Sequence, residues 1–169
     1  MYVFDATPLI YLATVERLAL LSDLPVRCVV PERVYEEVVT VGLEQGHTDA
    51  RRIERAVDKQ ILNRRSEPGS AMFERLRGND SLSDVDAAIL AMTADIGGTA
   101  VMDEQYGRAV ATAEGIETRG TAYLLLRLLQ EGRLPAEETR SVVDAMMDAG
   151  WYCTPNLYAR LLRKIEEHE

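Results

Sequence analysis

The stretch Leu82-Ser83-Asp84-Val85-Asp86-Ala87-Ala88-Ile89-Leu90-Ala91-Met92-Thr93 decides how we expect this chain to fold. From Ala87 onward it predicts an apolar helix whose small side chains let the backbone pack closely against a neighbour. Ser83 is placed to cap this helix, and Asp84 and Asp86 fall in its first turn, where the helix dipole favours acids. A place near the cap is enough to explain Asp84. We expect Asp86 to lie desolvated at the packed edge, which is costly unless its carboxylate meets a cation.

The length and composition of the chain indicate one globular domain. It has 169 residues, of which 47% are hydrophobic, so it is long enough for a single substantial core. Its longest apolar runs, such as 122–126, are too short to cross a bilayer. The first residues lack the charged and apolar regions of a signal peptide, and Cys28 and Cys153 form no metal-like pair. We therefore expect a single cytoplasmic domain over residues 1–169, with no membrane partner.

The charge of the chain is acidic overall but unevenly placed. The net charge is −9, which argues against broad affinity for polyanions. Between Arg51 and Arg77, however, eight basic residues stand against four acidic ones. We therefore expect residues 42–78 to form a basic insert, which is either an RNA-facing arm or a solvated surface. Lysine is nearly absent, which indicates either a halophilic protein or a genome that favours arginine codons.

Strands alternate with helices along the chain. The expected strands are 2–4, 27–30, 60–63, 99–102 and 116–118. The expected helices are 9–13, 18–21, 31–41, 49–57, 72–76, 84–96, 108–113, 122–129 and two more that begin at Pro135 and Pro155. A turn is expected over 42–46. This alternation predicts an α/β fold with three α/β/α layers around a central, mostly parallel sheet, plus a C-terminal helical extension over 135–169.

Four acids are expected to meet at one edge of this sheet. Asp5 and Asp103 each directly follow an apolar strand, and the carboxyl ends of parallel strands form the binding edge of such sheets. Crowded carboxylates persist only when cations neutralise them or when some stay protonated. Oxygen ligands of this kind select Mg²⁺ or Mn²⁺, which can activate water at a phosphodiester. The four acids that we expect to be catalytic are Asp5, Glu37, Asp86 and Asp103.

Four stretches of the chain occur in the order of the motifs of a known family. They are Phe4-Asp5-Ala6-Thr7-Pro8-Leu9-Ile10-Tyr11-Leu12, Pro31-Glu32-Arg33-Val34-Tyr35-Glu36-Glu37-Val38, the stretch 82–91 and Val101-Met102-Asp103-Glu104-Gln105-Tyr106-Gly107-Arg108. With them the chain resembles PIN domains, metal-dependent ribonucleases that include the VapC toxins, and it looks closest to a prokaryotic PIN-like subgroup. The resemblance implies metal ligands at Asp5, Asp86 and Asp103. Relatives often carry two aspartates in the fourth motif, so Glu104 is a further candidate for the last ligand.

The resemblance implies an endoribonuclease that holds Mg²⁺ or Mn²⁺ and cuts RNA, as the toxin of a toxin–antitoxin pair. The residues expected to bind RNA are Thr7, Arg51, Arg52, Arg55, Arg64, Arg65 and Arg108. Thr7 is equally well explained as a helix cap, and Arg108 as the partner of a local acid.

Two other functions fit the same residues. One is a non-catalytic PIN-like module that binds RNA or protein, and the other is a phosphatase acting on small phosphoesters. His47 and His168 adjoin no nucleophile pattern, which disfavours serine- or cysteine-type triads. The expected partners are RNA, an antitoxin protein and a second copy of the chain. The homodimer is expected because the apolar residues of 122–129 and 157–162 exceed what one small sheet needs to cover.

Overall fold

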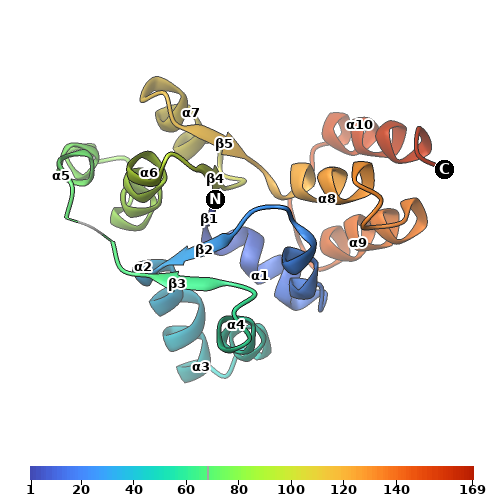
Figure 1. Cartoon of the computed structure of the whole chain (residues 1–169), viewed down its shortest axis with the longest axis horizontal. Coiled ribbons are helices and arrows are strands. Elements are labelled where there is room, and N and C mark those ends of the chain that lie inside the picture. The colour runs from blue at the N-terminus through green and yellow to red at the C-terminus, as the bar shows by residue number, and fades with distance from the viewer. Residues whose placement is uncertain (68) are drawn as a thin grey trace.

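A five-stranded sheet forms the centre of the computed structural model, which describes residues 1–67 and 69–169. The strands are β1 (Tyr2–Phe4), β2 (Cys28–Pro31), β3 (Asn63–Arg65), β4 (Thr99–Val101) and β5 (Glu117–Arg119). All four pairings are parallel, and the strand order is β3-β2-β1-β4-β5 (Figure 1). The predicted three-layer α/β/α fold with a parallel sheet is confirmed.

Helices connect the strands and cover the sheet. They are α1 (Ala6–Thr14), η1 (Leu18–Asp23), α2 (Glu32–Tyr35), η2 (Glu36–Val41), α3 (Gly42–Glu44), α4 (Thr48–Asp58), α5 (Ala71–Arg77), α6 (Asp84–Ile96), α7 (Gln105–Ala113), α8 (Thr121–Gln130), α9 (Ala136–Asp148) and α10 (Pro155–Glu166). Of these, η1 is a 3₁₀ helix and η2 is π-helical. Helix α1 packs against α4, whereas α6 packs against the strands β1, β2 and β4 (Figure 1).

Helix α6 is the apolar helix expected from the sequence. Its residues from Ala87 to Thr93 are all buried, because α6 packs between the sheet and the helices α2 and α5. The hydroxyl of Ser83 accepts a hydrogen bond from the amide of Asp86 at 3.0 Å, which confirms Ser83 as the cap. The helix ends at Gly97, whose φ of 61° is a left-handed conformation that glycine adopts without strain. The cap therefore fixes where the first-turn acids stand relative to the sheet.

Three local predictions are wrong. The expected turn at 42–46 is helical as far as Glu44, because Gly42 lies close against Ala50: a Cβ added to Gly42 would lie 2.7 Å from that residue's Cβ. The expected strand at 60–63 is shifted to 63–65, since Leu62 turns into the core. Helix α1 begins at Ala6 with Asp5 as its cap, so the cap reading of Thr7 is also wrong.

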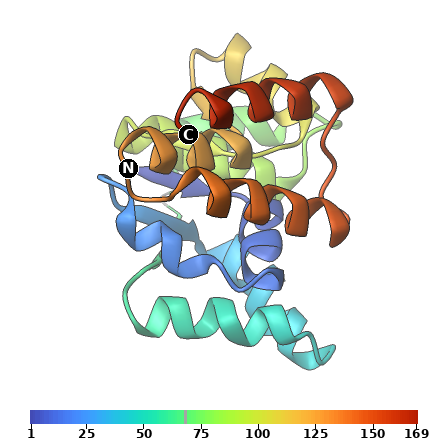
Figure 2. The same ribbon diagram turned by 90° about the vertical axis from the view of Figure 1, so that its right-hand side faces the viewer.

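The C-terminal helices α8, α9 and α10 pack against one another beside the sheet (Figures 1 and 2). Leu125, Leu128 and Leu161 are buried among them. The chain's own helices thus cover much of the apolar surface that predicted a homodimer, so that reason for a dimer no longer holds. Within residues 1–67 and 69–169, no helix is long and apolar enough to cross a membrane.

Candidate active site

The strand order places the carboxyl ends of β1 and β4 next to each other. The chain leaves this sheet in opposite directions from these two strands, and ligands of open α/β sheets bind at such a switch point. Asp5 follows β1 directly, and its backbone amide donates to the carbonyl of Val101 at 2.9 Å. Asp103 follows β4 by two residues. The topology therefore brings together two acids that are far apart in the sequence.

Asp5 is the buried carboxylate of the site. Its side chain is 7% exposed, and it accepts a hydrogen bond from the amide of Ala6 at 2.6 Å. Burial and, to a smaller extent, the nearby charges of the other three predicted acids, Asp86, Glu37 and Asp103, raise the pKa of Asp5 to about 7, against the effect of the Ala6 hydrogen bond. The structure thus brings the four predicted acids into electrostatic range of one another.

Asp86 and Glu37 approach this group from two helices. Asp86 lies in the first turn of α6, is partly exposed, and accepts a hydrogen bond from the Ser83 hydroxyl at 2.7 Å. The expectation that Asp86 is the desolvated acid is therefore wrong, and Asp5 takes that place. Glu37 lies in η2 and is exposed, so it meets solvent at the same edge.

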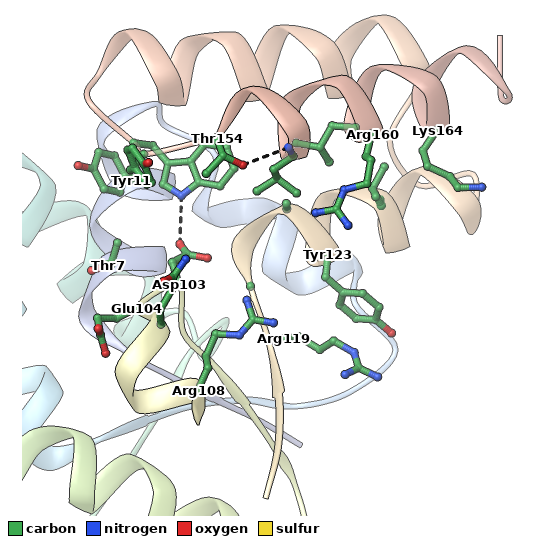
Figure 3. A pocket seen from close by; sticks show the side chains of 18 of the residues that line it. Thr7, Tyr11, Asp103, Glu104, Arg108, Arg119, Tyr123, Thr154, Arg160 and Lys164 are labelled. Atoms are coloured by element: carbon green, nitrogen blue, oxygen red, sulfur yellow. Dashed lines mark hydrogen bonds between the residues drawn. The ribbon is translucent and has the colours of Figure 1, made fainter. Parts of the chain in front are cut away.

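Asp103 is held by three hydrogen-bond donors. The amide and hydroxyl of Thr121 each donate to its carboxylate at 2.8 Å. The indole of Trp151 donates to it at 3.1 Å, the dashed line at Asp103 in Figure 3. Thr121 and Trp151 are both buried, with 0% and 4% of their surface exposed. A Cβ added to Gly120 would lie 2.9 Å from Asp103 Oδ1, so only glycine leaves room for the carboxylate in this position. The orientation of Asp103 is fixed from three sides.

Glu104 has a different role in the described structure. Its carboxylate caps α7 by accepting hydrogen bonds from the amides of Tyr106 at 2.9 Å and Gly107 at 2.7 Å. The charge of Asp103, by contrast, is one of those that raise the pKa of Asp5. Of the two candidates for the last ligand, Asp103 therefore belongs to the group around Asp5, and Glu104 stands beside it as a helix cap.

The donor set fits a hard divalent cation. Its members are all carboxylates, and one of them is buried where its negative charge is disfavoured, which a divalent cation would relieve. Among the described residues, no three His, Cys, Asp or Glu side chains already stand close enough to form a ready-made metal cluster. A cation bound here would therefore draw the carboxylates toward itself.

Two of the arginines predicted to bind RNA are engaged within the fold. Arg52 donates to the carbonyls of Ala13 at 2.9 Å and Thr14 at 3.2 Å, and pairs with Glu16 at 2.7 Å. It thus sits at the end of α1 that is farthest from Asp5, which caps the other end of this nine-residue helix. Arg64 pairs with Glu32 and its guanidinium lies 4.1 Å from the ring centre of Tyr35.

The other predicted RNA-binding residues divide into two groups. Arg51 and Arg55 are exposed on α4 and line a small hollow beside His47, and Arg65 lies 3.7 Å from the sulfur of Met1. Thr7 and Arg108, by contrast, line a larger cavity next to Asp103. The structure therefore separates the arginines of the insert from the residues beside the acids, and the RNA-binding role of both groups stays a prediction.

This larger cavity includes residues that were not predicted from the sequence. We name it the C-terminal groove; its volume is about 1280 Å³, and its polar and aromatic lining beyond Thr7, Asp103 and Glu104 is Tyr11, Gln105, Arg108, Arg119, Tyr123, Trp151, Tyr152, Thr154, Arg160, Arg163, Lys164 and Glu167 (Figure 3). A signal was present, since Arg160, Arg163 and Lys164 have the spacing of one helix face. The apolar residues of the same helix gave the stronger pattern and indicated only its buried face.

Comparison with known proteins identifies the family. The sequence matches, over residues 1–167, the family model described as DUF3368, a PIN domain. No curated protein and no solved structure matches the chain.

Proposed function

This chain belongs to the DUF3368 family of PIN domains, and from that membership we propose that it is a metal-dependent endoribonuclease. PIN domains are generally nucleases that use divalent metals. The observation that carries the proposal is the buried Asp5 at the switch point, surrounded by Asp86, Glu37 and Asp103. A fold has no structural need for three further carboxylates around a buried one, whereas an Mg²⁺ or Mn²⁺ site does.

We assign the metal-holding role to Asp5, Asp86 and Asp103. A divalent cation held there would supply Lewis acidity toward the phosphodiester and lower the pKa of an attacking water. Trp151 and Thr121 hold the Asp103 carboxylate in one orientation, as neighbours of ligands commonly do. Glu37 is exposed at the same edge and is our candidate for the group that accepts the proton of the attacking water.

The toxin role, the antitoxin partner and the homodimer stay predictions. The alternative of a non-catalytic binding module makes a different prediction, because such a module would bind RNA without cutting it. A phosphatase would hydrolyse a chromogenic phosphate ester and leave RNA intact.

The proposal is tested with end-labelled single-stranded RNA incubated with Mn²⁺, with Mg²⁺ or with EDTA. Cleavage should require the metal, and Asp86→Asn should lower its rate by at least ~100-fold, since two orders of magnitude are only ~2.7 kcal/mol of transition-state stabilisation. Asp84→Asn is a matched control: Asp84 lies in the same helical turn, but its side chain is exposed and lies 3.4 Å from Arg77. It should cut RNA like the wild type. Cleavage in EDTA, or equal losses in both variants, would refute the proposal.

A further inference from the structure

The C-terminal groove begins at Asp103 and runs between α7 and β5 on one side and α8 and α10 on the other (Figure 3). Its volume of about 1280 Å³ is larger than the roughly 300–1,000 Å³ typical of pockets for small molecules. Its lining includes Asp103, one of the four acids at the switch point. Its size therefore suits a chain-like ligand that passes this acid.

Positive charge gathers in the groove although the protein as a whole is acidic. Its charged lining is Arg108, Arg119, Arg160, Arg163 and Lys164 against Asp103, Glu104 and Glu167. Arg119 pairs with Glu117 at 2.8 Å and Lys164 with Glu167 at 2.7 Å. The side chains of Arg108 and Arg160 form no ion pair or hydrogen bond with any other described residue.

Arg108 and Arg160 come from opposite walls of the groove. Arg108 belongs to α7 and Arg160 to α10, and both guanidinium groups point into the groove in Figure 3. Both side chains are exposed. Two exposed cations without a partner among the described residues, facing each other across a groove, are suited to phosphates of one backbone.

Aromatic side chains accompany these cations. Tyr152 is 80% exposed, and it lines the groove next to the buried Trp151. The guanidinium of Arg119 lies 4.9 Å from the ring centre of Tyr123, another lining residue. Proteins that bind single strands combine a positive groove with aromatic rings on which bases stack. An exposed tyrosine in a basic groove thus favours a ligand whose bases are unpaired.

We propose that the C-terminal groove binds the single-stranded RNA segment that flanks the bond to be cut, with phosphates at Arg108 and Arg160 and a base on Tyr152. This assignment rests on the proposed function, and it places the RNA between α7 and the C-terminal extension and not on the basic insert. Double-stranded RNA should bind more weakly, because its stacked bases cannot reach Tyr152.

Binding is measured in EDTA by fluorescence anisotropy of a labelled single-stranded RNA of 12 nucleotides, over a series of salt concentrations. Loss of one phosphate contact in Arg160→Gln or Arg108→Gln should make the negative slope of log K against log salt less steep by about 0.7. Tyr152→Leu should weaken binding by about tenfold and leave the slope unchanged, because stacking releases no counterions. Arg133→Gln is the control, since Arg133 is exposed, lies outside the groove and carries the same charge.

Four results would overturn the proposal. The first is a wild type that does not bind the RNA, and the second is an Arg160→Gln protein whose salt slope is unchanged. The third is an equal change of slope in the Arg133→Gln control. The fourth is a loss of affinity confined to Arg51→Gln, which would place the RNA on the insert. In the second case, a wild type that still cuts RNA would refute RNA binding in the groove and leave the proposed function intact. A wild type that binds through the groove but never cuts would instead support the groove and refute the nuclease.

Discussion

Asp5 and Asp103 follow neighbouring strands and carry the same carboxylate, but their surroundings differ. Asp5 is buried with one backbone donor, and three other acids face it. Asp103 accepts three hydrogen bonds, from the amide and hydroxyl of Thr121 and from the indole of Trp151. The sheet brings the two acids together, whereas Thr121 of α8 and Trp151 of the C-terminal extension stabilise the charge of only one of them. The same substitution to asparagine should therefore change stability in opposite directions.

The largest effect is expected at Asp5. In EDTA at pH 8, Asp5→Asn should raise the free energy of unfolding by roughly 2–3 kcal/mol, since each pKa unit corresponds to about 1.4 kcal/mol and the asparagine removes a disfavoured buried charge. Asparagine keeps the oxygen that accepts from the Ala6 amide. Urea unfolding of both proteins measures the difference, and a variant less stable than the wild type would show that Asp5 is a structural acid.

Asp103→Asn should have the opposite sign. Its amide group would turn a donor toward Thr121 or Trp151, so at least one buried donor loses its acceptor, at a cost of about 1–3 kcal/mol. The same unfolding experiment in EDTA measures the loss. Two variants that change stability in the same direction would remove the distinction between the two acids.

The pH dependence separates the two acids further. The pKa of Asp5 is about 7 in the folded protein and near 3.8 when unfolded, so between these values the folded state binds more protons. The stability that protonated Asp5 contributes is therefore present at low pH and is lost as pH rises toward 7, by at most about 1.4 kcal/mol per pH unit. Subtracting the profile of Asp5→Asn from that of the wild type, both in EDTA, isolates this contribution. A flat difference profile would contradict the raised pKa.

The smallest effect is expected at Trp151. Trp151→Phe keeps an aromatic ring but removes the donor to Asp103, so we expect a stability loss of about 1 kcal/mol and roughly tenfold weaker Mn²⁺ binding. Calorimetric titration measures the affinity for Mn²⁺, which should not change if Trp151 only packs in the core. Tyr152→Phe, at the exposed neighbour, is the control.

The places of the candidate acids in the fold could be predicted because local sequence determines them. Asp5 and Asp103 end apolar strands, and Asp86 follows a Ser83 cap at a fixed spacing. Which of them is buried could not be predicted, because the buried state of Asp5 depends on how helices from distant segments cover the edge. The local pattern around Asp86 pointed to the wrong acid for that reason.

The contacts of the C-terminal extension are beyond local patterns. Trp151 meets Asp103 across 48 residues of sequence, through the packing of α8, α9 and α10. Arg160 reaches the same groove only because α10 turns that face toward α7. Gly42 shows another limit, since a glycine serves equally for a turn and for close helix packing, and only the neighbouring Ala50 distinguishes the two.

The most direct test of the central claim, that the acids around Asp5 hold a divalent cation, uses the single tryptophan of the chain. Trp151 donates to Asp103, so its fluorescence reports on the site, and Mn²⁺ is a paramagnetic quencher. We predict saturable quenching by Mn²⁺ in the wild type that Mg²⁺ reverses, and at least ~10-fold weaker binding in Asp5→Asn. Equal saturable quenching of both proteins, or none in the wild type, would contradict the claim.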